Sequence, residues 1–180
     1  MKNRKLLSVV AAAFTLMLIA GVTTALLAAT NELTRGTIAQ RNEQAQNEAR
    51  RQVLAADSFE EKTLETDDGT VTYYAGTHGG DLVGYVFTVT TSGKSSGLVV
   101  MTGVDTQGRV TGVAVTENNE TAGYVDKVVQ GGLLASLTGR TSVDGVDAVS
   151  QATKTSNGIL RGVEEALSYY QAIAGGTADE

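Results

Sequence analysis

The stretch from Asp147 to Ser156 holds the residues of this chain that are best suited to chemistry. After Ser150 it contains three further hydroxyl groups and one lysine, and it leads into a helical pattern that runs from Ile159 to Ile173. The start of a helix offers free backbone N–H groups and the positive end of the helix dipole, and both favour a phosphate group. On spacing alone, a plain polar helix cap is favoured over a phosphate site.

Other kinds of chemistry have little support in the composition. The chain has no cysteine, which excludes disulfides, iron–sulfur clusters, thiolate zinc and cysteine nucleophiles. Its single histidine, His78, gives little support to a Ser-His-Asp triad or a multi-histidine site, and its glycine-rich context predicts a solvated turn residue. Asp105 resembles the start of a calcium loop, but the acidic positions that should follow are missing, so we expect a plain turn at 105–108. We predict no metal site.

Charge is distributed unevenly along the chain. The formal net charge is -6, and three of the 14 basic residues, Lys2, Arg4 and Lys5, precede an uncharged run that ends at Asn31. All 20 acidic residues follow that run. Because an acidic surface repels both nucleic acid and anionic lipid, the sequence predicts neither as a partner of the C-terminal part.

Residues 6–30 form an apolar run without charges. As a helix this run exceeds the ~30 Å hydrocarbon core of a bilayer, which predicts a single transmembrane helix. A cleaved signal peptide is the alternative, but the run is much longer than the ~7–15 apolar residues typical of one. The basic residues place residues 1–5 in the cytoplasm and the rest of the chain outside. The absence of cysteine removes a lipoprotein alternative.

Residues 31–56 are rich in Gln, Glu, Asn, Arg and Ala and carry a sparse apolar face, which predicts a helical stalk. A solvated helical linker without specific docking explains them equally well. Residues 57–174 are expected to form an α+β domain, with an antiparallel sheet and flanking helices, and residues 175–180 a disordered tail. The predicted strands are 71–75, 82–90, 98–104 and 109–116, paired as two hairpins with turn residues at 76–81 and 105–108; the predicted helices are 125–137 and 157–173.

Two polar loops of this domain carry a family resemblance. Asp147-Ala-Val-Ser-Gln-Ala-Thr153 is similar to the flavinylation signature Asp-x-x-Ser/Thr-Gly-Ala-Thr, apart from Gln151, where glycine is usual. Glu120-Thr-Ala-Gly-Tyr-Val125 is similar to Glu-Thr-Pro-Gly-Leu-Gly of the same family. With the N-terminal anchor and the hairpin order, the chain resembles the covalent-FMN subunit of Rnf-type ion-translocating ferredoxin:NAD oxidoreductases. The corresponding flavin-carrying subunit of the sodium-pumping NADH:quinone oxidoreductase is the near relative.

The departures from the family pattern have unequal consequences. Gln151 adds a side chain near the modified hydroxyl, so the backbone there must tolerate a residue other than glycine. Ala122 in place of proline lowers the rigidity of the loop but changes no chemistry. Tyr124 in place of leucine could lie against the flavin or the neighbouring strand.

The resemblance implies that Thr153 carries FMN through a phosphoester and that a separate flavin transferase attaches it from FAD. Its attachment site would comprise Ser150, Gln151, Ala152, Lys154, Thr155 and Ser156. The remaining loop would place Glu120, Thr121 and Gly123 against the ribityl chain or the isoalloxazine edge. The resemblance implies no catalytic residue, because the transferase performs the attachment.

The function implied is electron relay within a membrane-bound, redox-driven ion translocase. The isolated chain would be an electron carrier in the inner cell membrane, with its FMN domain outside the cytoplasm and the other membrane subunits as partners. Two alternatives stay open. One is the covalent-FMN subunit of another system, either the sodium-pumping NADH:quinone oxidoreductase or an extracytoplasmic flavin reductase. The other is a membrane-anchored binding module without flavin.

Overall fold

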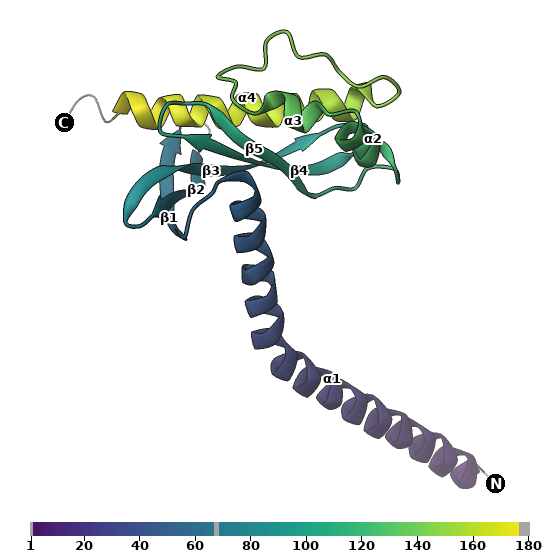
Figure 1. Ribbon diagram of the computed structural model, residues 1–180. Helices are drawn as coiled ribbons and strands as arrows, with labels where there is room; N and C mark the ends of the chain where they lie inside the picture. Colours follow the sequence, from purple (N-terminus) through teal and green to yellow (C-terminus); the bar gives the residue numbers. More distant parts are fainter. Residues whose placement is uncertain (1, 67–68, 177–180) are drawn as a thin grey trace. The chain divides into compact units, whose positions relative to one another are not determined.

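The computed structural model describes residues 2–66 and 69–176, with side chains for 13–28, 30–31, 43–66 and 69–176. The chain consists of two compact units, Met1–Ala45 and Gln46–Glu180. The elements, in chain order, are α1 (Lys2–Val53), β1 (Ser58–Thr66), β2 (Gly69–His78), β3 (Asp81–Ser92), β4 (Ser96–Asp105), β5 (Val110–Glu117), α2 (Tyr124–Gln130), α3 (Leu133–Leu137) and α4 (Thr153–Gly176) (Figure 1).

The first unit is the N-terminal part of α1, and its helical conformation agrees with the helices expected over 6–30 and 31–56 up to Val53. The described side chains of 13–28 are all exposed. They include large apolar groups such as Phe14, Leu16 and Leu27. Within the described residues, no helix combines the length and the apolar character that a membrane crossing requires. The side chains of 6–12 and 29 lie outside the described residues, so the predicted span stays a prediction.

The second unit is built on a five-stranded antiparallel sheet in the order β1-β2-β3-β4-β5. This sheet with its flanking helices confirms the predicted α+β class. Strand β4 is buried along almost its whole length, because helices cover both of its faces. Helix α4 lies across one face (Figure 1), and the last turns of α1, from Gln46 onward, pack on the other through Val53 and Leu54.

Helix α4 presents an apolar stripe to β3 and β4, with Ile159, Val163 and Leu167 buried at helical spacing. Each such side chain stabilises the fold by roughly 1.5–3 kcal/mol through burial. Two glycines let the helix approach the sheet closely. A Cβ on Gly158 would lie 2.7 Å from the carbonyl oxygen of Ser92, and one on Gly162 would lie 2.9 Å from Val100.

The strands extend beyond their predicted limits, and β1 was not predicted. Most side chains of β1 are exposed and several are charged, as suits an edge strand, so the strand has little of the alternation that identifies a strand in sequence. The turn predicted at 76–81 is shorter than expected, because β2 continues to His78. His78 is therefore the last residue of a strand and not a turn residue. It is solvated as predicted, with its Nδ1 3.0 Å from Asp57.

The helices also differ from expectation. The single helix predicted over 125–137 is two helices, α2 and α3, because Gly132 adopts a left-handed conformation (φ 76) after Gly131. Helix α4 begins at Thr153, four residues before the predicted start, because the hydroxyl-rich segment is itself the first turn. It continues to Gly176, so the first residues of the predicted disordered tail are helical, and 177–180 lie outside the described residues.

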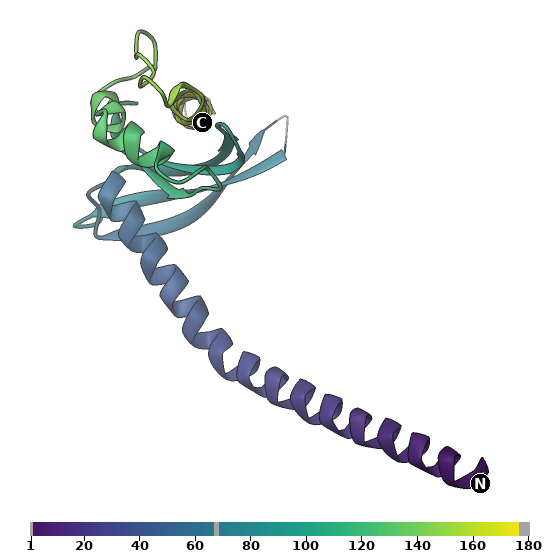
Figure 2. The same ribbon diagram turned by 90° about the vertical axis from the view of Figure 1, so that its right-hand side faces the viewer.

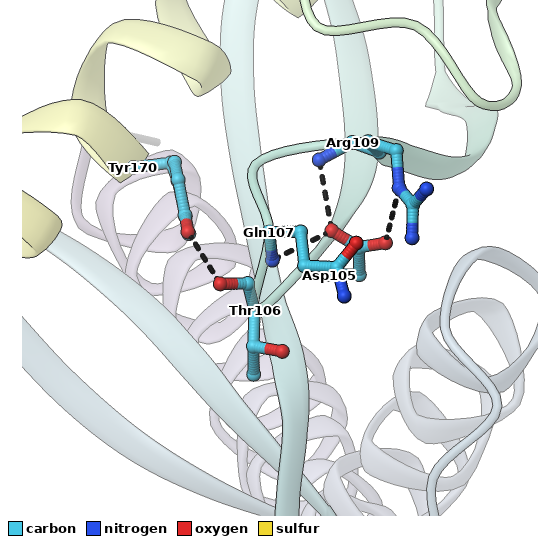
Figure 3. Close-up of polar contacts among 5 residues, drawn as sticks. All are labelled: Asp105, Thr106, Gln107, Arg109 and Tyr170. Atoms are coloured by element: carbon cyan, nitrogen blue, oxygen red, sulfur yellow. Dashed lines mark hydrogen bonds and ion pairs between the residues drawn. The ribbon is translucent and has the colours of Figure 1, made fainter.

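The turn at 105–108 forms as predicted and is organised by Asp105, as Figure 3 shows. Burial favours protonation of Asp105, but hydrogen bonds from Arg109 and Gln107 and the charge of Arg109 outweigh it, so the pKa of Asp105 is lowered. The hydroxyl of Tyr170 donates to the carbonyl of Thr106 at 2.8 Å and ties α4 to this turn. Burial, the neighbouring Tyr85 and the negative charge of Asp105 raise the pKa of Tyr170.

Candidate functional site

The first turn of α4 presents one exposed hydroxyl between buried groups. Thr153, the first residue of the helix, is exposed, and none of the described residues hydrogen-bonds to its hydroxyl. Thr155 and Ser156 are 1% and 0% exposed. The hydroxyl of Ser156 accepts a hydrogen bond from the N–H of Val149 at 3.1 Å. Of the three hydroxyls in this turn, Thr153 is thus the accessible one.

Glu120 joins the start of α4 to the turn between β3 and β4. One carboxylate oxygen accepts a hydrogen bond from the hydroxyl of Thr155 at 3.1 Å, and the other accepts from the N–H of Ser95 at 3.0 Å. Both carboxylate oxygens of Glu120 therefore have protein partners. The sequence assigned Glu120 to the cofactor, and that role stays a prediction. What the geometry assigns to it is the positioning of the turn that carries Thr153.

A cavity of about 280 Å³ opens beside Thr153. Its lining combines the predicted residues Gln151, Ala152, Thr153, Lys154 and Thr155 with Lys94 and Tyr124. The predicted Ser150 is exposed immediately before them, and Ser156 lies beneath them. Thr121 and Gly123, both predicted to contact the cofactor, are not among its lining residues. They lie in the loop before α2, where Gly123 has a left-handed conformation (φ 85).

Three lysines surround this cavity, although the domain carries an excess of acidic residues. Lys94 and Lys154 line it, and the ammonium groups of Lys94 and Lys127 lie 4.8 Å and 5.6 Å from the ring centroid of Tyr124. Lys127 also donates to the side chain of Gln151 at 3.3 Å. The sequence-based prediction missed Lys94 and Lys127. No local signal identifies them, because only folding brings three separate segments together.

Gln151 has a strained backbone. Its φ of 64° makes it the one residue other than glycine with a positive φ in the described part of the chain. A side chain costs roughly 1–2 kcal/mol in this conformation, which glycine adopts freely. This geometry gives a physical reason for the glycine that is usual at this position in the family that the sequence resembles.

The residues around Thr153 have the chemistry to hold a phosphate group. An anion there would meet the N-terminal N–H groups of α4 and its dipole, together with Lys94 and Lys154, which line the cavity. Both carboxylate oxygens of Glu120 are occupied by hydrogen bonds from protein donors. Among the described residues, no cluster of histidine and carboxylate side chains has the geometry of a metal site.

Two known protein families match parts of the chain. Residues 93–168, which contain Lys94, Glu120 and Thr153, match the family described as an FMN-binding domain. Residues 1–53 match the family described as the RnfG N-terminal region. The chain therefore belongs to the RnfG-type FMN-binding subunits. Membership implies that other Rnf subunits are its partners and that it serves a membrane-bound redox complex. No curated protein matches the chain.

Proposed function

We propose that this chain is the electron-relay subunit of an ion-translocating ferredoxin:NAD⁺ oxidoreductase and that it carries FMN on the hydroxyl oxygen of Thr153. The observation that carries the proposal is the contrast in the first turn of α4. Thr153 is exposed beside a cavity, whereas Thr155 and Ser156 are buried and engaged. A modifying enzyme could reach the first hydroxyl without unfolding the helix.

The attachment itself is a phosphoryl transfer. The oxygen of Thr153 forms a bond to the FMN phosphorus of FAD, the pyrophosphate bond breaks, and AMP leaves. A separate flavin transferase supplies the base that accepts the hydroxyl proton. The protein's own contribution is to present the hydroxyl and to stabilise the remaining negative charge of the phosphodiester with Lys94, Lys127 and Lys154.

Bound FMN would accept and pass on electrons between partner subunits, while the chain supplies orientation and electrostatics. The cavity of about 280 Å³ lies just below the ~300–1,000 Å³ range of complete ligand pockets, so it suits the phosphate and ribityl chain. The flavin ring would then lie toward Tyr124 and the solvent, where a partner can approach it. Nearby ammonium groups would favour the reduced, more negative flavin and so raise its potential.

The N-terminal part of α1 is proposed to anchor the domain in the membrane, with residues 6–30 as the span. Support comes from the exposed apolar side chains along 13–28 and the absence of Asp, Glu, Lys and Arg between residues 6 and 30. The orientation rests on the basic residues Lys2, Arg4 and Lys5. Extraction with alkaline carbonate should leave the full chain in the membrane fraction, and release of the chain would contradict an integral anchor.

Mass spectrometry of the full chain, co-expressed with a flavin transferase, tests the attachment. Trypsin should release a peptide ending at Lys154 whose added mass equals that of bound FMN less one water. Thr153→Ala should remove the added mass and the flavin fluorescence of the denatured band. The matched control is Ser150→Ala, since Ser150 is also exposed and lies three residues away. Fluorescence that persists in Thr153→Ala but not in Ser150→Ala would assign the flavin to Ser150.

Co-purification separates the remaining alternatives. A mature Rnf subunit should leave the membrane together with other subunits of its complex. A fluorescent chain that purifies alone under conditions preserving such complexes would favour a separate flavin reductase. A chain that stays colourless and unmodified with an active transferase would contradict a covalent flavoprotein.

A further inference from the structure

A cleft separates β2 from β3 at one end of the sheet. The two strands pair from Tyr73 and Phe87 toward the β2–β3 turn. Beyond that point, residues 70–72 pair with β1 and residues 88–90 pair with β4, but within the described sheet the two segments do not pair with each other. The cleft between them has a volume of about 570 Å³. Helix α4, which contributes Glu165 to the cleft, is seen end-on over one face of the sheet in Figure 2.

Hydroxyl groups dominate the walls of this β2–β3 cleft. Four threonines from the two strands line it, namely Thr70, Thr72, Thr88 and Thr90. Helix α4 contributes Glu165, which is about 18 Å from Thr153 at ~1.5 Å per residue of helix. The cleft is therefore separate from the proposed flavin attachment site.

A buried arginine also lines the cleft. Arg50, in the last turn of α1, is 8% exposed, and its guanidinium carbon lies 3.6 Å from the ring centroid of Tyr74. One terminal nitrogen donates to Asn47 at 2.7 Å. The Nε–H has no hydrogen-bond partner among the described residues. A buried guanidinium group with an unsatisfied donor is destabilising, so a carboxylate held against this group would stabilise the protein.

We propose that the β2–β3 cleft binds a small monocarboxylate bearing hydroxyl groups, whose carboxylate pairs with the guanidinium group of Arg50. A planar carboxylate matches the donor geometry of a guanidinium group. The threonine hydroxyls can exchange hydrogen bonds with a hydroxylated body. The carboxylate of Glu165 in the wall disfavours a doubly charged anion such as a phosphate monoester. The volume lies within the ~300–1,000 Å³ usual for small-molecule pockets.

NMR spectroscopy of the ¹⁵N-labelled full chain in detergent micelles tests this proposal directly. The signals to follow are those of the arginine Nε–H groups. The probe is sodium gluconate. Sorbitol is one control, because it has a similar polyol body without a carboxylate, and sodium chloride is the control for ionic strength. The Arg50 signal is assigned from its absence in Arg50→Lys or, if that variant fails to fold, from its proximity to the Tyr74 ring. Arg109 is an internal reference, because its Nε–H already donates to Asp105 at 3.1 Å.

Gluconate should move the Arg50 signal saturably, with half-saturation below about 10 mM, which is a weak affinity in binding terms. Sorbitol and sodium chloride should leave it in place, and the Arg109 signal should not move with any of the three. The proposal is overturned if the Arg50 signal stays fixed, if sodium chloride moves it equally, or if both arginine signals move together.

A pair of threonine variants tests the location within the fold. Thr88→Val removes a hydroxyl that lines the cleft and should weaken gluconate binding severalfold. Thr63→Val removes an exposed hydroxyl of β1 that does not line it, and should leave binding unchanged. Equal affinities in the two variants would contradict binding in the cleft. None of these measurements requires FMN, so their outcome is independent of the proposed function.

Discussion

Two carboxylates of this domain each organise a polar loop, one through sequence neighbours and the other through distant segments. Asp105 accepts hydrogen bonds from the N–H groups of Gln107 at 2.8 Å and Arg109 at 2.9 Å, and from the side chain of Arg109. All of these partners lie within four residues of Asp105. The turn is therefore complete as soon as its own short segment is ordered.

Glu120 works over a much longer range. Its partners Ser95 and Thr155 are 25 and 35 residues away in the chain. They meet Glu120 only when α4 is packed on the sheet. The turn at 105–108 therefore depends on local chemistry, whereas the start of α4 depends on the whole domain. Variants that weaken packing should affect flavin attachment long before they affect the turn.

The largest effect is expected from Gly158→Ala, which leaves both carboxylates in place but disturbs the packing of α4. The new Cβ would lie 2.7 Å from the backbone oxygen of Ser92 and 3.0 Å from Leu98. Because a backbone atom cannot easily move away, we expect a loss of about 3 kcal/mol in the free energy of unfolding and reduced FMN attachment. Urea unfolding and gel fluorescence measure the two effects.

Gly175→Ala is the matched control for that variant, because it lies in the same helix with no atom within 4 Å of the new Cβ. It should be neutral or stabilising by up to about 1 kcal/mol through helix propensity. Equal losses in both variants would indicate a general effect on the helix and not its close contact with the sheet.

Glu120→Ala should cost about 2 kcal/mol, because the N–H of Ser95 and the buried hydroxyl of Thr155 lose their acceptor. Hydrogen exchange of the Ser95 amide should accelerate, and flavin attachment should fall. Adding Thr155→Val should restore part of the stability, since the second buried donor is then removed as well. Glu117→Ala, at an exposed position of β5, is the control and should be neutral. Strictly additive effects of the two substitutions would argue against a direct bond.

Asp105→Asn should cost about 1 kcal/mol near neutral pH through weaker hydrogen bonds, and it should leave flavin attachment unchanged. The pKa of Asp105 is lowered from 3.8 on folding. Asp105 therefore stabilises the fold fully at a pH above its pKa in the unfolded chain. This stabilisation is lost as the pH falls through its pKa in the folded protein. The difference between wild type and variant in urea unfolding should therefore shrink below about pH 4. A difference that grows in acid would contradict the lowered pKa.

The smallest effect is expected from Gln151→Gly, which relieves the left-handed strain at the attachment site. The gain of roughly 1–2 kcal/mol in the folded state is partly offset by the greater freedom of glycine in the unfolded chain, so we expect a net stabilisation of about 0.5 kcal/mol. Gln151→Ala keeps the strain and loses the bond to Lys127, so it should not stabilise. If Gln151→Gly and Gln151→Ala stabilise the protein equally, the cause would be the loss of the glutamine side chain and not the relief of backbone strain.

Prediction from sequence succeeded where the signal is periodic and local. Runs of β-branched and aromatic residues between turn residues identified β2 to β5, and a helical stripe identified α4. Prediction failed for β1, because this edge strand is polar. It also failed for the break between α2 and α3, because the paired glycines were not recognised as the end of a helix. Within the candidate site, the sequence singled out the hydroxyl-rich stretch but not Lys94 and Lys127, because these two lysines lie on other segments.

Local patterning was thus sufficient for the two predicted hairpins, the turn at Asp105 and the apolar stripe of α4, because each depends on residues a few positions apart. Tertiary structure alone decided that Thr153 is exposed while Thr155 is buried, that Glu120 has protein partners, and that Lys94 and Lys154 line one cavity. It also decided the burial of Arg50 beside the β2–β3 cleft. The physical reason is that strand register and helix packing set distances between residues far apart in the chain, and no local pattern encodes those distances.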